Sequence, residues 1–150
     1  MLIKQSIKIV IFAWLFSDTL LAQNDKSSPT YDFTIYSGCG WGGSVSGQFN
    51  QFKELITAKK YSQISANIHS GDALTQLISV IALEELEKRK LLVISVVDRE
   101  LISLVKRSEK RYYYCTGCTG HFYDVVKDIF NNTGWLNIAP NIRYRIGLQD

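Results

Sequence analysis

The chain has 150 residues, three cysteines and a formal net charge of +3, and 46% of its residues are hydrophobic. This length is enough for one domain that buries its own core without a dense disulfide framework. Because the charge excess is small, it requires no polyanionic partner, and we expect no nucleic-acid binding.

The N-terminal segment has the pattern of a secretory signal peptide. Two lysines precede an apolar run over residues 9–16, and Ala22 closes the segment ahead of a polar stretch. Asp18 interrupts the apolar residues, so the run falls short of the about 20 residues that cross a bilayer. We therefore expect a signal peptide over residues 1–22, a secreted or periplasmic product, and no integral membrane span after cleavage. The product would carry 15 basic and 13 acidic residues, since cleavage removes two of 17 and one of 14.

The next part of the chain is expected to hold little regular structure. Residues 23–30 are polar and predict a flexible leader, and residues 31–37 alternate in polarity as a short strand or extended arm does. Five glycines between Gly38 and Gly47 predict a loop. Gly38, Gly40 and Gly43 also satisfy the G-x-G-x-x-G spacing, but the second strand and following carboxylate of a dinucleotide fold are missing, so we interpret the match as loop composition.

From residue 48 onward the apolar spacing is typical of helices. It predicts helices over 48–59, 61–68 and 73–90, a fourth after residue 95, and a last one over 122–130. Asp72 is predicted to cap the third of these, and Ser95 with Asp98 forms a capping box for the fourth, although residues 91–95 also fit a short strand. The tail would pack on the bundle or pair with the arm at 31–37. We predict a mainly α fold, in which residues 31–150 form a single compact bundle of four to five amphipathic helices with a short extended N-terminal arm.

The stretch from Phe49 to Phe130 resembles HEAT-like helical hairpins. The closest pattern is KKYSQISANIHSGDALTQLISVIALEELEKR, in which a shorter helix turns into a longer one rich in small and aliphatic residues. Two hairpins are too few for a groove-forming solenoid, which needs about three repeats. The resemblance implies a compact helical fold that binds protein and carries no catalytic site.

The three cysteines either remain free thiols in a mild redox environment or take one of three other arrangements. Cys115, Cys118 and His121, with Cys39 as a fourth ligand, would make a Cys3His zinc site. Cys115 and Cys118 alone form a C-x-x-C pair of the kind found in redox proteins, and their surroundings resemble a thioredoxin-like active site. We favour a structural disulfide that joins Cys39 to Cys115 or Cys118, because oxidising compartments favour disulfides.

Nothing else in the sequence indicates a catalytic centre. The chain has no H-E-x-x-H and no G-x-S-x-G motif. A group of aromatic residues around the C-x-x-C pair would form either a ligand platform or local packing, and we favour packing; its members are Tyr112, Tyr113, Tyr114, Phe122 and Tyr123. We therefore expect an exported, non-catalytic protein-interaction or structural module without a cofactor, and the alternative is a thiol/disulfide or zinc-binding protein that uses the motif at 115–118.

Overall fold

A computed structural model describes residues 30–117, 120–131 and 138–149 of the chain. Residues Tyr31–Asp150 form one compact unit. In its described part, six helices accompany a four-stranded mixed sheet, so the fold is α/β and the prediction of a helical bundle is wrong. The predicted signal peptide, residues 23–29 of the predicted leader, Cys118 and the segment 132–137 between the last two helices lie outside the described residues.

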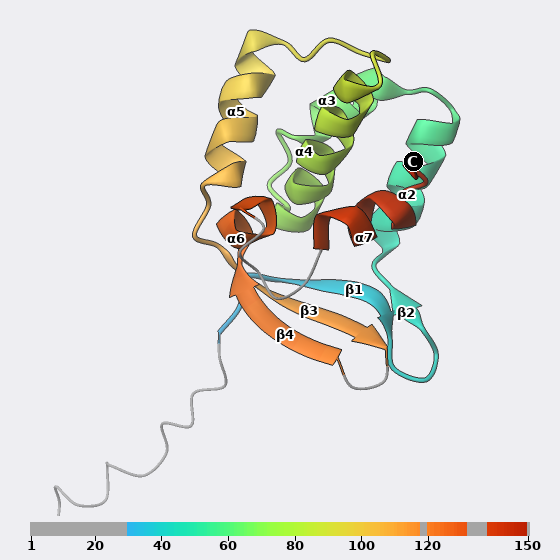
Figure 1. Cartoon of the computed structure of the whole chain (residues 1–150), viewed down its shortest axis with the longest axis vertical. Helices are drawn as coiled ribbons and strands as arrows, with labels where there is room; N and C mark the ends of the chain where they lie inside the picture. Colours follow the sequence, from blue (N-terminus) through green and yellow to red (C-terminus); the bar gives the residue numbers. More distant parts are fainter. Residues whose placement is uncertain (1–29, 118–119, 132–137, 150) are drawn as a thin grey trace, which may run out of the picture. The chain divides into compact units, whose positions relative to one another are not determined.

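The sheet brings together two strands from the start of the described chain and two strands that lie after the first four helices. Its strands are β1 (Phe33–Cys39), β2 (Ser44–Val45), β3 (Arg111–Gly117) and β4 (Gly120–Val125), in the order β2-β1-β3-β4. β1 runs parallel to β3, whereas β2 and β4 are antiparallel to their neighbours. The expected extended arm is therefore an inner strand of the sheet (Figure 1).

Four helices connect β2 to β3, and two more follow β4. The first four are α2 (Gly47–Thr57), α3 (Tyr61–Asn67), α4 (Ala73–Lys88) and α5 (Val96–Lys106), and the last two are α6 (Val126–Asn131) and α7 (Ile138–Arg145). The predicted N-caps are confirmed, because the side chain of Asp72 accepts from the N–H of Thr75, and that of Ser95 accepts from the N–H of Asp98. Of the predicted capping box only this Ser95 half is present, since the carboxylate of Asp98 contacts Ser65 and His69. Such caps satisfy backbone N–H groups that have no partner within the helix.

The last predicted helix, over 122–130, is only half correct. Residues 120–125 form strand β4, and the helix begins at Val126. Phe122 and Val125 have helical spacing to the apolar residues of α6, but they belong to a strand that pairs along its length with β3. The segment 91–95 contains no strand, and the tail folds into α7 rather than pairing with β1.

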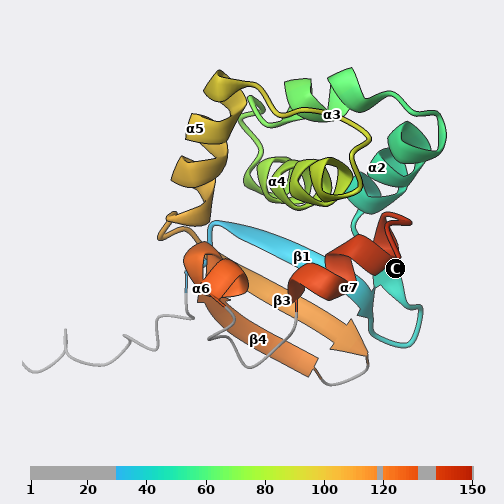
Figure 2. The same ribbon diagram turned by 45° about the horizontal axis from the view of Figure 1, so that its top comes forward.

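The core lies between the sheet and the helices, on one side of the sheet only (Figure 2). The central helix α4 buries an almost continuous run of residues from Leu77 to Leu83. From the sheet, Ile35, Tyr112 and Tyr114 point into this core and are nearly inaccessible to solvent. Because side chains alternate along a strand, the residues between them face the opposite side of the sheet.

Candidate functional site

The face of the sheet that points away from the core carries a cluster of aromatic rings. We call it the tyrosine face, and its members are Tyr31, Tyr36, Tyr113, His121 and Tyr123. The strand register places Tyr113 directly opposite Tyr123, with His121 two residues along the same strand face. Tyr31 precedes β1 and is 48% exposed, and Tyr123 is 51% exposed, so the rings are open to solvent.

Tyr113 is the centre of the tyrosine face. Its ring stacks on Tyr31 with centroids 5.5 Å apart and on His121 at 5.6 Å, and it meets Tyr123 at 5.0 Å in a tilted arrangement. The hydroxyl of Tyr113 also contacts Nδ1 of His121. Ring pairs at these distances attract one another beyond their burial, so the cluster is held in place before any ligand arrives.

The surroundings of Tyr113, at the centre of the tyrosine face, shift its pKa. Partial desolvation, together with the neighbouring hydroxyls of Tyr123, Tyr36 and Tyr31, raises the pKa of Tyr113. Its hydroxyl therefore stays protonated and remains a hydrogen-bond donor. The protonated hydroxyl of Tyr113 and the aromatic rings around it suit contacts with uncharged polar and apolar groups of a partner.

A disulfide between Cys39 and Cys115 fixes one end of the tyrosine face. Cys39 ends β1 and Cys115 lies near the end of β3, and the two are 76 residues apart in the sequence. Beyond the disulfide, the N–H of Gly40 donates to the carbonyl of Gly117 (2.9 Å). Gly40 and Gly117 both have positive φ angles, which explains why glycine stands there.

The turn between β1 and β2 carries the most exposed large side chain of the described chain. Trp41 is 99% exposed, and the turn around it closes through a hydrogen bond from the N–H of Gly43 to the carbonyl of Gly40. The conformations of the three glycines in G-x-G-x-x-G are those of a tight turn, with positive φ at Gly38, Gly40 and Gly43. The motif thus shapes a hairpin tip and precedes strand β2 rather than a helix.

The structure brings together three of the four sequence-predicted site residues. Cys39 and Cys115 are bonded to each other, so neither offers a thiolate to a metal ion, and His121 lies directly opposite Cys115 on β4. No group of three metal-ligating side chains occurs among the described residues. Cys118 lies outside the described residues, so what was expected of Cys118 stays a prediction.

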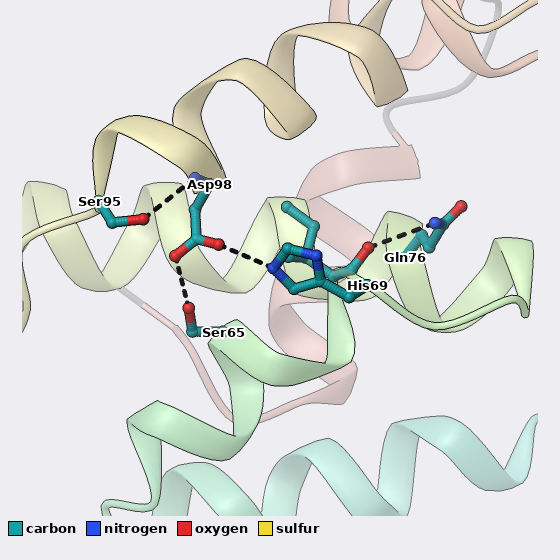
Figure 3. Close-up of polar contacts among 6 residues, drawn as sticks. Ser65, His69, Gln76, Ser95 and Asp98 are labelled. Carbon is teal, nitrogen blue, oxygen red and sulfur yellow. Dashed lines mark hydrogen bonds and ion pairs between the residues drawn. The ribbon is translucent and has the colours of Figure 1, made fainter.

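A second polar cluster joins three residue types that hydrolases use. Ser65 Oγ donates to Asp98 Oδ2 at 2.7 Å, and His69 Nε2 lies 3.1 Å from Asp98 Oδ1 (Figure 3). A catalytic triad requires the serine to bond the histidine, whereas here both bond the carboxylate. The hydrogen bond from Ser65 is the largest cause of a lowered pKa of Asp98, which makes this carboxylate a weak base. The cluster is therefore a structural connection between α3 and α5.

A cavity of about 760 Å³ lies between α4, α5 and α6 and is lined by charged and apolar groups. Two ion pairs occupy its walls, Lys106 Nζ with Glu84 Oε1 at 2.8 Å and Arg99 Nη2 with Glu87 Oε1 at 2.6 Å. Lys106 also lies over the ring of Phe130, 5.2 Å from its centroid. The four charged groups of these two ion pairs therefore largely satisfy one another.

Comparison of the chain with protein-family models, with curated proteins and with solved structures found no match. The resemblance to HEAT-like hairpins therefore stays a prediction. Within residues 30–117, 120–131 and 138–149, the structure contains no helix that is long and apolar enough to cross a membrane.

Sequence reasoning found the aromatic residues but assigned them to packing as one group. The structure divides them, because Tyr112 and Tyr114 are buried in the core whereas Tyr113 and Tyr123 lie on the open face. Three consecutive tyrosines show no alternation in polarity, so the pattern that usually marks a half-buried strand was absent. The strand signal that was available was the high β-propensity of the Tyr-Tyr-Tyr-Cys-Thr run.

Proposed function

We propose that the chain is an exported, non-catalytic binding module that contacts a protein partner through the tyrosine face. The observation that carries this proposal is the exposure of a pre-stacked set of rings on the side of the sheet that no described helix covers. The disulfide supports an oxidising compartment, and hence the predicted signal peptide.

Tyrosine suits such a surface for two physical reasons. Each ring offers a large apolar area and a hydroxyl while only two side-chain torsions need to be fixed, and tyrosine is enriched at the energetic centres of protein interfaces. In this protein the torsions of Tyr113 are already restricted by its neighbours Tyr31, Tyr123 and His121. Binding therefore loses less side-chain entropy than it would on a surface of isolated rings.

The test is a comparison of three forms of the secreted chain as immobilised bait. The forms are the wild type, a face variant Tyr113→Ser/Tyr123→Ser, and a control variant Tyr144→Ser, whose ring is also exposed but lies on α7. Each bait is exposed to the envelope and secreted fractions of the source cells, and bound proteins are quantified by mass spectrometry. Circular dichroism first establishes that all three baits are folded.

We expect at least one protein to bind the wild type and the control but not the face variant. Titration of that purified protein should then show at least about a tenfold loss of affinity for the face variant, since two central aromatic side chains are removed and each contributes more than about 1 kcal/mol to binding. Equal recovery on all three baits, or none above a bait-free matrix, would overturn the proposal.

A further inference from the structure

The two edges of the sheet differ in how they are protected. The β2 edge is two residues long, and its pairing with β1 is interrupted by a register shift between Ser37 and Cys39. The β4 edge is six residues long and pairs with β3 without any shift. Natural proteins shield long edges with charged side chains, proline or bulges. β4 (GHFYDV) has no proline and no bulge, and its one charged residue, Asp124, stands near its end.

The hydrogen-bond pattern identifies which backbone groups of β4 face the open edge. The N–H of Val126 donates to the carbonyl of Lys110 (3.0 Å), whereas the N–H of Val125 donates to the carboxylate of Asp124 (2.9 Å). Antiparallel pairs alternate between hydrogen-bonded and non-hydrogen-bonded, so the N–H and C=O groups of Tyr123 and His121 point away from β3. No described strand lies beyond β4 to receive them (Figure 1).

The free groups are arranged so that a second copy of the same strand satisfies them. In an antiparallel pair of two β4 strands centred on Phe122, His121 of one copy stands opposite Tyr123 of the other. Each of these two pairs forms two N–H···O=C bonds, so all four free N–H groups and all four carbonyls are used. The Asp124 carboxylate already occupies the next outward N–H, that of Val125, and so limits the pairing to this central segment.

Phe122 supports the same centre of symmetry. It lies on the core side of the sheet opposite Tyr114, yet 38% of its surface is exposed because nothing described covers it at the edge. At the centre of the pairing it would meet its own counterpart as a non-hydrogen-bonded pair, in which side chains approach most closely. Positions 121–123 hold no aspartate, glutamate, lysine or arginine, and the pairing sets His121 opposite Tyr123 rather than opposite its own counterpart, so no like charges face each other across the axis.

We propose that two copies of this chain pair through β4 about a two-fold axis at Phe122. The product is a continuous eight-stranded sheet, in which the two tyrosine faces become one surface. The proposal does not rest on the partner proposed above, because a monomer that still binds this partner would contradict only the pairing.

The first test measures the mass in solution of the secreted chain by sedimentation equilibrium over a wide concentration range. We expect a monomer–dimer equilibrium for the wild type and for Val93→Lys, a control at an exposed loop position. Phe122→Lys should be monomeric because two like charges would face each other across the axis, and Tyr123→Pro should be monomeric because it removes an outward N–H without removing a bond to β3. A monomeric wild type, or dimers that persist in both variants, would overturn the proposal.

The second test determines the register. In a Cys118→Ser background, Phe122→Cys is expected to form an intermolecular disulfide on mild oxidation, because the two residues face each other at the axis. His121→Cys and Tyr123→Cys should not form this disulfide, because position 121 of one copy stands opposite position 123 of the other. The Cα atoms of the two identical positions would then lie farther apart than the about 7 Å that a disulfide spans. A cross-link at position 121 or 123 without one at 122 would contradict the two-fold axis at Phe122.

Discussion

Replacing both bonded cysteines tests the covalent link in the sheet. The variant is Cys39→Ala/Cys115→Ala, which leaves Cys118 as the single cysteine of the chain. The disulfide closes a loop that spans 76 residues, and on a chain-entropy model a crosslink of that length destabilises the unfolded state by about 4.5 kcal/mol at 25 °C. This value is comparable with the total stability of many small domains, about 5–15 kcal/mol, so the variant should be only marginally stable.

The assay is urea unfolding of the oxidised wild type, the reduced wild type and the variant, followed by circular dichroism. With a slope of about 2 kcal/mol per molar urea, the expected loss shifts the midpoint by about 2 M, and the reduced wild type should resemble the variant. Cys118→Ala is the matched control and should unfold like the oxidised wild type. A loss below about 1 kcal/mol, or unreduced wild type in which both Cys39 and Cys115 react with an alkylating agent, would refute the reasoning.

Three further predictions concern the carboxylates. Asp98→Asn should lower the free energy of unfolding by about 1–3 kcal/mol, measured by urea titration, because the acceptor of Ser65 and His69 loses its charge. Since the folded pKa of Asp98 lies below its ordinary value of 3.8, its contribution is present above about pH 5 and is lost as the pH falls through the lowered pKa. Thermal melts of wild type and Asp98→Asn should therefore converge toward about pH 2, and a constant difference would contradict this assignment. Partial burial and the neighbouring Asp128 raise the pKa of Asp124. Asp124→Asn should therefore raise the melting temperature at neutral pH, because it removes a penalty of a few tenths of a kcal/mol. This gain in melting temperature should shrink as the pH falls below the raised pKa of Asp124.

The local features of the fold could be predicted from the sequence. Asp72 and Ser95 mark the starts of α4 and α5 because capping depends on residues three positions apart. The expected oxidising compartment correctly suggested a disulfide that includes Cys39, although the sequence left Cys115 and Cys118 open as its partner. The caps could be predicted because each depends on a residue and its near neighbours in the sequence. The disulfide could be predicted because a chain with three cysteines offers few possible partners.

The sheet could not be predicted because its decisive pairing is long-range. The N–H of Asp32 donates to the carbonyl of Arg111, and nothing near Asp32 in the sequence indicates that partner. The tyrosine face was missed for the same reason. Tyr113 lies on the outer face only because β1 and β4 place Tyr112 and Tyr114 in the core. A run of identical side chains carries no information about which of them points inward.

The connection from β1 to β3 also sets the order in which the molecule can assemble. Helices α2 to α5 lie between the two strands, and each can begin to form from local contacts as soon as it is synthesised. β1 must wait for a partner that is about 79 residues away, which at about 5–20 residues per second takes roughly 4–16 s of synthesis. Until then its aromatic side chains have no sheet to join, and Cys39 has no neighbouring strand that brings Cys115 within bonding distance. The tyrosine face and the disulfide therefore arise in the same late step, so a molecule that displays the assembled face has already closed its sheet.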